Sequence, residues 1–252
     1  MNFTKYMNRN AFEEELVETT ERIGSWTEFA EAKLEIHSTY KGQWRGRARH
    51  GYGILTRSDG QCYEGFFVDD HAHGMGRFSL ATGSIYDGQW HEGCKHGHGT
   101  YTNVDGITYD GQWRQDEKFG FGVETYPDKA RYEGQYQHGW KHGVGKYVST
   151  LGFSYEGQFK QDKMDGDGTY KFMDGRKYTG QWQVGRMSGF GRMNWPHGSF
   201  FEGTFENGVK HGKGTFIQPD GRIYCGSWRN GQLVDGSETS VKGEWRKTQK
   251  WV

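Results

Sequence analysis

Regularly spaced histidines are the residues of this chain that most suggest chemistry. Imidazole nitrogens bind zinc at about 2 Å from the metal. These histidines, however, occupy equivalent places of a repeat, and in a sheet such places lie about 9.6 Å apart. We therefore interpret them as turn residues that hydrogen-bond local backbone, and leave a metal site open only for the denser pairs His71 with His73 and His96 with His98. Five of them directly precede Gly-x-Gly: His50, His73, His96, His142 and His211.

Repeated carboxylates and the Gly-x-Gly pattern are the other candidates for chemistry. Paired catalytic carboxylates lie about 5–10 Å apart across a bound substrate, whereas these follow one exposed strand face. Gly-x-Gly occurs in eight of nine repeats, without the helix N-terminus and Lys-Ser/Thr pair of a phosphate-binding loop. No Gly-x-Ser-x-Gly elbow occurs either. We predict no catalytic residue, no metal, no cofactor and no enzyme activity.

The elements that carry these residues repeat with a period of 23. Gly follows the first aromatic residue by two places and a second aromatic by four, so the three residues share one face of a strand. Gly-x-Gly and a loop Gly come next, which predicts strand, turn, strand, turn in each unit. The first aromatic residues, without insertion or deletion, are Tyr40, Tyr63, Tyr86, Tyr109, Tyr132, Tyr155, Tyr178, Phe201 and Tyr224.

The fullest copy, Tyr86 to Gly99, reads Tyr-x-Gly-x-Trp-x-x-Gly-x-x-His-Gly-x-Gly. This pattern closely resembles the MORN repeat (membrane occupation and recognition nexus), and the resemblance covers residues 40 to about 236. Lys129 replaces the loop Gly of its unit, and Asp165 stands in the His place of another. The signature Val-x-Gly-x-Trp returns at 241–245, which we interpret as a shortened closing strand.

We therefore predict an all-β fold: an elongated, single-layer, twisted antiparallel β-meander of nine hairpin repeats. The array occupies 39–246, after an N-terminal segment 1–38 and before a tail 247–252. Repeats about 9.6 Å apart extend to roughly 85 Å. The two aromatics of each unit are expected to lie over the neighbouring glycines, which leave room for flat rings.

The N-terminal segment lacks the glycine rhythm. Asn10, Phe12, Leu16 and Ile23 predict a capped amphipathic helix that ends at Gly24. Ser25-Trp-Thr-Glu28 matches a capping box and predicts a second short helix, with Trp26, Phe29, Ala30 and Lys33 or Leu34 along one face. These helices either cover the first edge strand and part of the aromatic face or dock on another chain.

Composition bounds the partners and the compartment. Lys plus Arg and Asp plus Glu number 32 each, so no net field favours nucleic acid. Cys62, Cys94 and Cys225 stand at three different repeat places and do not form a repeated disulfide, which favours a reducing compartment. The N-terminus is acidic and no apolar stretch approaches the roughly 20 residues of a membrane span. We predict a cytoplasmic protein.

A one-layer sheet leaves an aromatic face with little cover, which predicts a docking surface for another protein. The resemblance implies the same, because related arrays serve in cilia, flagella and cortical cytoskeleton and hold partner helices. We predict a scaffold or adaptor that binds a helical or extended segment, within a cilium, flagellum or cytoskeletal assembly. The expected partner-binding residues are Tyr63, Trp90, Tyr109, Trp113, Tyr132, Tyr136, Tyr155, Tyr178 and Trp182.

Two other functions stay open. The family's name implies membrane or phosphoinositide association, and a basic aromatic tail offers contacts for it. Similar repeats also accompany lipid kinases or methyltransferases, which implies regulation of such an enzyme in trans. The closing strand leaves an edge that a second copy could pair with. The residues expected to contact a membrane are Lys242, Trp245, Arg246, Lys247, Lys250 and Trp251.

Overall fold

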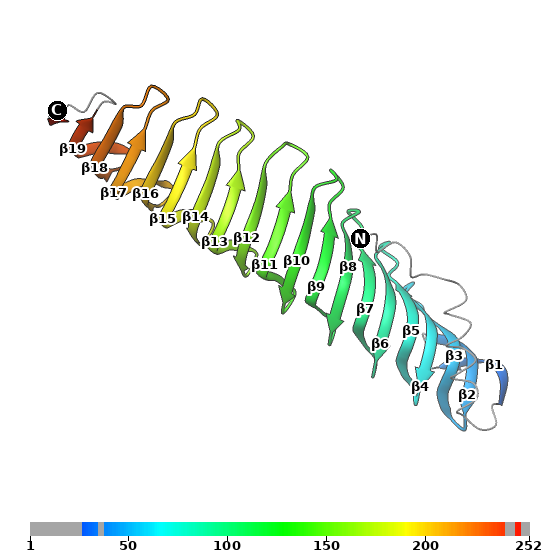
Figure 1. The fold of residues 1–252 in the computed structure, drawn as a ribbon. Coiled ribbons are helices and arrows are strands. Elements are labelled where there is room, and N and C mark those ends of the chain that lie inside the picture. Colours follow the sequence, from blue (N-terminus) through cyan, green and yellow to red (C-terminus); the bar gives the residue numbers. More distant parts are fainter. Residues whose placement is uncertain (1–26, 35–37, 240–244, 248–252) are drawn as a thin grey trace. The chain divides into compact units, whose positions relative to one another are not determined.

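The structure is a computed structural model that describes residues 27–34, 38–239 and 245–247. Within each of the two units described next, Figure 1 shows strands that follow one another side by side in chain order. The chain divides into two units, Met1–Cys94 and Lys95–Val252. Within each unit, the strands in extensive contact are neighbours in sequence, so each unit is a one-layer meander over its described residues. The predicted first helix, residues 10–24, lies outside the described residues.

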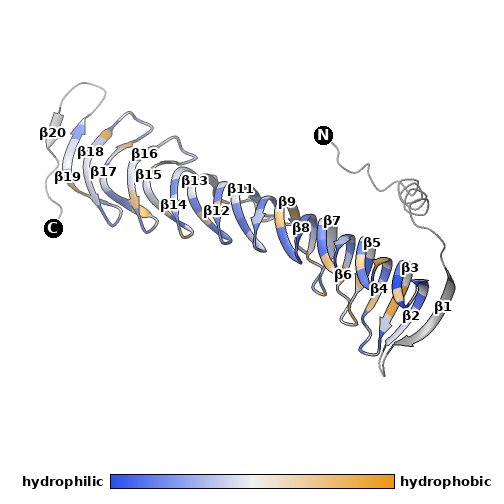
Figure 2. Cartoon of the chain, turned by 90° about the horizontal axis from the view of Figure 1, so that it is seen from below, coloured by the Kyte–Doolittle hydropathy of each residue, from blue (hydrophilic) through white to orange (hydrophobic). Residues whose placement is uncertain are grey.

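Unit 1 contains antiparallel strands that pair in sequence from β1 to β6. Hydrophobic and hydrophilic residues alternate along them, as Figure 2 shows by hydropathy. Tyr63, Gly65 and Phe67 are buried, whereas Glu64 between them is exposed. This is the predicted strand alternation. The strands are β1 (Thr27–Leu34), β2 (Ser38–Arg45), β3 (Ala48–Arg57), β4 (Cys62–Val68), β5 (His71–Ser79) and β6 (Ile85–His91).

Unit 2 continues the same antiparallel meander. β19 pairs with β20, so Trp245 of the predicted closing strand lies in a strand, while 241–244 lie outside the described residues. The slipped pattern at 224 is accommodated by pairing Gly226 with Gly236. The strands are β7 (Cys94–Thr102), β8 (Thr108–Arg114), β9 (Glu117–Thr125), β10 (Arg131–Gln137), β11 (Trp140–Val148), β12 (Ser154–Lys160), β13 (Lys163–Lys171), β14 (Lys177–Gln183), β15 (Arg186–Asn194), β16 (Phe200–Glu206), β17 (Val209–Ile217), β18 (Ile223–Arg229), β19 (Gln232–Thr239) and β20 (Trp245–Lys247).

The second predicted helix is wrong from Thr27 onward. Residues Thr27–Leu34 form β1, which pairs antiparallel with β2, placing Ala30 opposite Gly42 and Ala32 opposite Tyr40. Without this pairing, β2 would be an edge strand with a row of unpaired backbone groups. The need to cover that edge outweighs the local capping-box signal. The first repeat is therefore closed by a strand instead of a helix.

In seven hairpins two glycines lie opposite one another and the first aromatic ring of the repeat lies against both. In the last hairpin Gly226 pairs with Gly236, and the atoms nearest to a Cβ there are backbone atoms and Leu233 instead of the Tyr224 ring. Gly134 pairs with Gly145, and a Cβ on Gly145 would stand 2.6 Å from Cζ of Tyr132. The Tyr132 hydroxyl donates a hydrogen bond to the Gln135 carbonyl at 3.0 Å, which holds the ring flat. The prediction that both aromatics lie over neighbouring glycines is confirmed for the first aromatic of these seven hairpins, whereas the second packs against the first, as Tyr136 does against Tyr132.

A β-bulge follows the first glycine in eight of the repeats, for example between Gly134 and Tyr136. A bulge bends its strand and increases the local twist. The side chain of Gln135 closes the irregularity, because its Oε1 accepts the backbone N–H of Val144 at 2.8 Å. Gln112 and Gln181 do the same for Phe121 and Phe190, so these glutamines support the strands.

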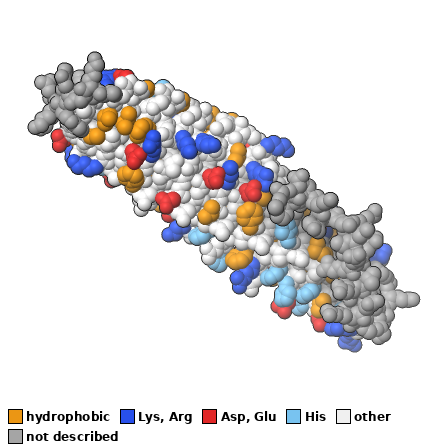
Figure 3. All heavy atoms as spheres, in the orientation of Figure 1, with side chains coloured by type: hydrophobic (Ala, Val, Ile, Leu, Met, Phe, Trp, Pro, Cys, Tyr) orange, Lys and Arg blue, Asp and Glu red, His pale blue; other side chains and the backbone are white. Residues whose placement is uncertain are grey.

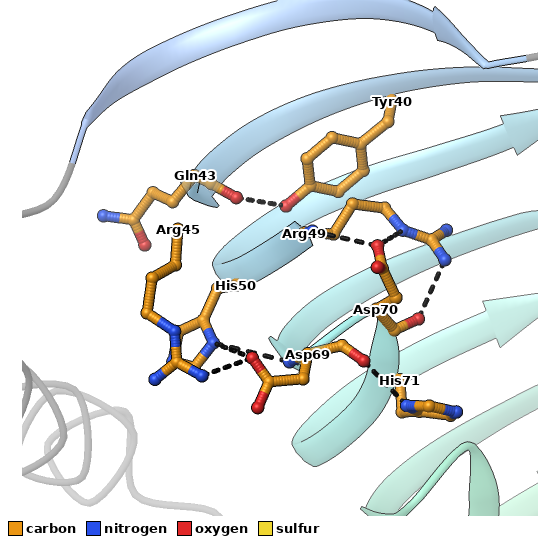
Figure 4. A network of polar contacts seen from close by, with 8 residues as sticks. All are labelled: Tyr40, Gln43, Arg45, Arg49, His50, Asp69, Asp70 and His71. Atoms are coloured by element: carbon orange, nitrogen blue, oxygen red, sulfur yellow. Dashed lines mark hydrogen bonds and ion pairs between the residues drawn. The ribbon is translucent and has the colours of Figure 1, made fainter. Parts of the chain in front are cut away.

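Turns of successive repeats are joined by paired hydrogen bonds. The Asp162 backbone N–H donates to the Lys141 carbonyl at 3.0 Å, and its carboxylate accepts from the Lys141 N–H at 2.8 Å. In unit 1 the equivalent pair joins the Arg49 N–H to the Asp70 carboxylate at 2.9 Å and the Asp70 N–H to the Arg49 carbonyl at 3.0 Å. Figure 4 shows the first of these bonds and an additional one from the Arg49 Nε to the same carboxylate. These contacts link one 23-residue repeat to the next at the turn, independently of the strand ladder.

His50, one of the motif histidines, contacts the next repeat instead of its own turn. His50 is 2% exposed, and its Nδ1 lies 3.4 Å from the backbone N of Asp69 and 3.3 Å from the Asp69 carboxylate (Figure 4). Asp165, in the same repeat place, accepts the backbone N–H of Val184 at 3.0 Å. The expected role as a hydrogen-bond partner of the backbone is therefore correct for His50, but the backbone it contacts belongs to the following repeat.

Lys129 offers a direct test of the loop interpretation. It adopts φ of 69° at the place where other repeats carry glycine, such as Gly152 with φ of 94°. A left-handed backbone disfavours residues with a Cβ. We expect Lys129→Gly to raise the free energy of unfolding by about 0.5–1 kcal/mol, measured by urea denaturation. The reverse change, Gly152→Lys, should lower it by a similar amount; a destabilised Lys129→Gly variant would contradict this interpretation.

Candidate partner-binding face

The strands present two faces, named here by their side chains. The inner face carries the repeated first and second aromatics, and the outer face carries the residues between them. All nine predicted partner-binding residues belong to the inner face. Tyr63 and Trp90 lie in unit 1, and the other seven lie in unit 2. Their exposed fractions are Tyr63 6%, Trp90 8%, Tyr109 0%, Trp113 6%, Tyr132 0%, Tyr136 4%, Tyr155 2%, Tyr178 0% and Trp182 7%.

The expectation that these rings remain thinly covered is wrong. Tyr136 packs edge-on against Tyr109 at a centroid distance of 5.0 Å and against Tyr132 at 5.3 Å. Tyr132 in turn meets Phe159 at 5.2 Å, and this edge-to-face order continues through unit 2 to Trp228. Bulged, bent strands and neighbouring rings bury the floor of the inner face without a second layer. We call this buried set the ring floor.

A second set of rings lies on the inner face and is only half-buried. Tyr126 meets Tyr147 at 6.2 Å, and Tyr147 meets Phe153 at 5.9 Å. Phe153 and Tyr170 are nearly parallel, at 5.9 Å and 11°, and Tyr170 meets Phe172 at 4.6 Å. We call these five residues the ring track. The sequence carries a signal for it that the predictions did not use, because Tyr101, Tyr147 and Tyr170 recur at a fixed place of the second strand.

Lysines lie among the rings of the inner face. Lys118 Nζ is 4.8 Å from the Tyr109 ring centroid, and Lys141 Nζ is 5.2 Å from that of Tyr132. Lys210 Nζ lies 4.2 Å from the Trp228 centroid and 4.9 Å from that of Phe216, and burial lowers its pKa. Such cation–ring contacts stabilise by about 0.5–2 kcal/mol. The sequence predictions missed these lysines, although they share one repeat place.

Glu124 takes the place of a ring and organises a charged cluster. Its carboxylate lies 2.6 Å from Lys118 Nζ and 2.9 Å from Lys141 Nζ, and accepts a hydrogen bond from the Tyr126 hydroxyl at 2.7 Å. Burial alone would raise the pKa of Glu124, but the hydrogen bonds and charges of the two ammonium groups lower it to about 2. The carboxylate is therefore ionised at neutral pH.

A hollow of about 340 Å³ opens beside this cluster. Trp140 stands at its rim with 52% of its surface exposed. Asp162, also in the lining, uses its carboxylate on the Lys141 backbone. Aromatic, cationic and anionic groups thus meet at one end of the ring track. The lining residues are Lys118, Glu124, Tyr136, His138, Gly139, Trp140, Lys141 and Asp162.

The outer face is solvated and its charges are balanced. Lys146 pairs with Glu156 at 3.2 Å and Arg192 with Glu202 at 3.3 Å, with all four side chains largely exposed. Figure 3 shows blue and red side chains next to one another on the face it displays, with hydrophobic side chains between them. Exposed ion pairs of this kind contribute little stability. The predicted exposed strand face of the repeated carboxylates is confirmed at Glu64, Asp110, Glu133, Glu156 and Glu202.

The described residues contain no cluster of three or more His, Cys, Asp or Glu side chains with metal-binding geometry. Within the same residues, no helix has the length and apolar character to cross a membrane. The ring centroids of His73 and His91 lie 5.1 Å apart. Burial lowers the pKa of His73, and the nearby charge of His91 lowers it further.

Comparison with known sequences decides the family. The MORN repeat profile matches residues 40–62, 63–85, 86–108, 109–131, 132–150, 155–175, 178–200, 201–221 and 224–234. The chain belongs to the MORN repeat family. The resemblance predicted from Tyr86–Gly99 is therefore confirmed, with nine consecutive repeats. MORN repeats serve in protein or membrane interactions.

Among solved structures, this MORN-repeat chain shows loose similarity to two centriolar domains. The TCP10 domain of Danio rerio CPAP is 10% identical, with a TM-score of 0.41, and the match covers 88% of this chain and 100% of that chain. The TCP domain of SAS-4 (dCPAP) of Drosophila melanogaster, in complex with a proline-rich motif of Ana2, is 8% identical, with a TM-score of 0.32, over 71% and 84%.

Proposed function

We propose that this MORN-repeat protein is a non-enzymatic scaffold that binds a helical or extended protein segment on the inner face of unit 2. The observation that carries the proposal is the ring track: five adjacent aromatic side chains that stay half-buried beside two lysines and an exposed Trp140. Aromatic residues are enriched in the buried centres of protein interfaces, whereas scattered exposed apolar residues are ordinary.

The predicted partner-binding residues take a different role in this proposal. The ring floor fixes the sheet and supports the track, and the partner contacts the track and the rim of the hollow. Tyr170 shows the connection, because it meets the track residue Phe172 at 4.6 Å and the floor residue Trp182 at 5.8 Å. A floor substitution then lowers stability and binding together. A track substitution lowers binding first.

We further propose that the scaffold works in the cytoplasm at a cytoskeletal or ciliary assembly. Family membership and the protein-docking character of the inner face support this placement. The membrane alternative falls on side chains beyond those described, and it stays a prediction. Sedimentation with anionic and neutral liposomes at two salt concentrations tests it, since electrostatic lipid binding weakens as salt rises.

Capture of partners by the tagged full-length chain tests the scaffold function. Tyr147→Ala and Tyr170→Ala should each remove a specific subset of the captured proteins while the melting temperature changes by less than about 4 °C. Phe78→Ala in unit 1 is the matched control, because Phe78 stands at the same repeat place and is also half-buried. Unchanged capture by both track variants, or equal losses in the Phe78 variant, would overturn the proposal.

A further inference from the structure

Two histidines face one another across neighbouring strands of unit 1. Gly74 of β5 pairs with Trp90 of β6, and His73 directly precedes the first of these residues while His91 directly follows the second. In an antiparallel pair, His73 and His91 therefore stand opposite one another. Their ring centroids lie 5.1 Å apart and their ring planes meet at 48°. Sequence spacing brings out His71 as the neighbour of His73, whereas strand pairing adds His91.

This separation suits two imidazoles that share one metal ion. Zinc binds imidazole nitrogen at about 2.0–2.1 Å with tetrahedral angles, which places the centroids of two such rings about 5 Å apart. The distance between His73 and His91 agrees with this value. His73 is half-buried and His91 is exposed at the end of its strand. An ion held between the two rings is therefore open to water, which completes its coordination.

Histidine occupies both of these places in one repeat only. The motif histidines of four other repeats are each followed, at the place of His91, by a residue that does not bind metal. Arginine and lysine there would repel a cation, and valine offers no ligand. Since other side chains fill this place, the repeat does not require histidine for its packing. The residues at that place are Val68 after His50, Arg114 after His96, Lys160 after His142 and Arg229 after His211.

The charges around the pair favour a cation of this class. Burial and then the charge of His91 lower the pKa of His73, and the carboxylate of Glu92 opposes them. His73 is therefore neutral at neutral pH, the form in which imidazole binds metal. Glu92 adds a nearby negative charge. Imidazole ligands suit zinc, copper and nickel, whereas calcium and magnesium prefer oxygen.

We propose that His73 and His91 form a two-histidine site for a divalent transition-metal ion, with Zn²⁺ as the ion of choice. A bound ion joins β5 to β6 and so clamps the repeat that begins at Tyr63 to the repeat that begins at Tyr86. The site belongs to unit 1, whereas the ring track belongs to unit 2. The metal site therefore stands or fails independently of the scaffold function.

Isothermal titration of the full-length chain with ZnCl₂ at neutral pH tests the proposal. His73→Ala and His91→Ala should each weaken the tightest zinc binding by about tenfold or more, which is about 1.4 kcal/mol. The double variant should bind no more weakly than either single variant, because the two rings act as one chelate and losing either ring removes it. Tight binding that persists in both single variants would overturn the proposal.

His71→Ala separates the two possible partners of His73. His71 lies on the same strand, and its Nδ1 is 2.8 Å from the Asp69 carbonyl oxygen. We expect this variant to change zinc affinity less than twofold. His138→Ala is the matched control in unit 2, since it also removes one exposed imidazole, and it should likewise change little. Loss of binding in His71→Ala with retention in His91→Ala would assign the metal to the wrong pair and overturn the proposal.

A second readout separates loss of the site from loss of the fold. His91→Arg introduces the residue type that other repeats carry at this place, so the variant should fold normally. Zinc at about 100 times its Kd should raise the melting temperature of the wild-type chain by about 5 °C or more, and a chelator should reverse the rise. The rise should be absent in His91→Arg. An equal rise in this variant would contradict the clamp between β5 and β6.

Discussion

Gly145→Ala is expected to lower the free energy of unfolding by about 3 kcal/mol or more, because overpacking a tight core site costs about 1–3 kcal/mol and the ring that must move also loses a hydrogen bond. A Cβ at this position would stand 2.6 Å from Cζ and 2.7 Å from Cε2 of Tyr132. Tyr132 is 0% exposed and its hydroxyl is bonded to the Gln135 carbonyl. The measurement is chemical denaturation followed by tryptophan fluorescence.

Gly139→Ala is the matched control for this change. Gly139 has φ of 80°, but a Cβ there would meet nothing within 4 Å. We expect a loss of about 1 kcal/mol from the left-handed backbone alone. In a Tyr132→Ala background, Gly145→Ala should cost much less, since the ring that it strikes is gone. Equal losses at Gly139 and Gly145, or an undiminished cost in the double variant, would contradict the packing of the ring floor.

Glu124→Gln is expected to destabilise the protein by about 2–4 kcal/mol, because it leaves two largely buried ammonium groups without their shared carboxylate. Both lysines lie within 3 Å of Glu124 at present, at 2.6 and 2.9 Å. Glu156→Gln serves as the control. It removes the exposed partner of Lys146 at 3.2 Å, and exposed pairs contribute at most about 1 kcal/mol. Similar losses for both variants would show that the cluster is not a buried network.

The same carboxylate predicts a pH dependence. The pKa of Glu124 lies near 2 in the folded protein, against an ordinary value of 4.5. A folded pKa below the unfolded one means that the stabilisation is present above about pH 4.5 and is lost as the pH falls from there towards 2. The difference in unfolding free energy between wild type and Glu124→Gln should therefore shrink over this interval. A difference that stays constant from pH 6 to pH 3 would contradict the assignment.

Much of the fold could be predicted from the sequence because its period is unbroken. The opposed glycines and the ring above them follow from two spacings, the 23-residue period and the alternation along a strand, and Gly134, Gly145 and Tyr132 lie as predicted. Lys129 adopts the positive φ expected of a loop glycine. In a repeat array, each copy confirms the interpretation of the others, which is unusual for a single sequence.

The exposure of the aromatic rings could not be predicted in this way. A flat one-layer sheet would leave them accessible, but the bulge after the first glycine in eight repeats bends the strands, and neighbouring rings cover one another edge-on. The period does not encode the degree of bending. Consequently Tyr132 and Tyr178, predicted as docking residues, are 0% exposed and belong to the ring floor.

Positions that depart from the repeat determine where the charged cluster and the ring track form. Glu124 replaces a ring and gathers Lys118 and Lys141, whereas Tyr147 and Tyr170 keep that place and form the track. The neighbours that a side chain meets depend on which strands pair with its own, and those strands lie one or two repeats away in the sequence. The error at Thr27–Leu34 has the same origin, because an edge strand in need of a partner overrode a local helix signal.

Site-specific photo-crosslinking tests the central claim most directly. A photoreactive phenylalanine analogue is placed at Tyr147 on the ring track, or at Glu156, which is exposed on the outer face. The full-length chain is then irradiated in cells and its adducts are identified by mass spectrometry. The inner-face scaffold predicts discrete protein adducts at position 147 that are lost in a Tyr170→Ala background, and few at 156. Adducts that form equally at both positions, or only at 156, would contradict it.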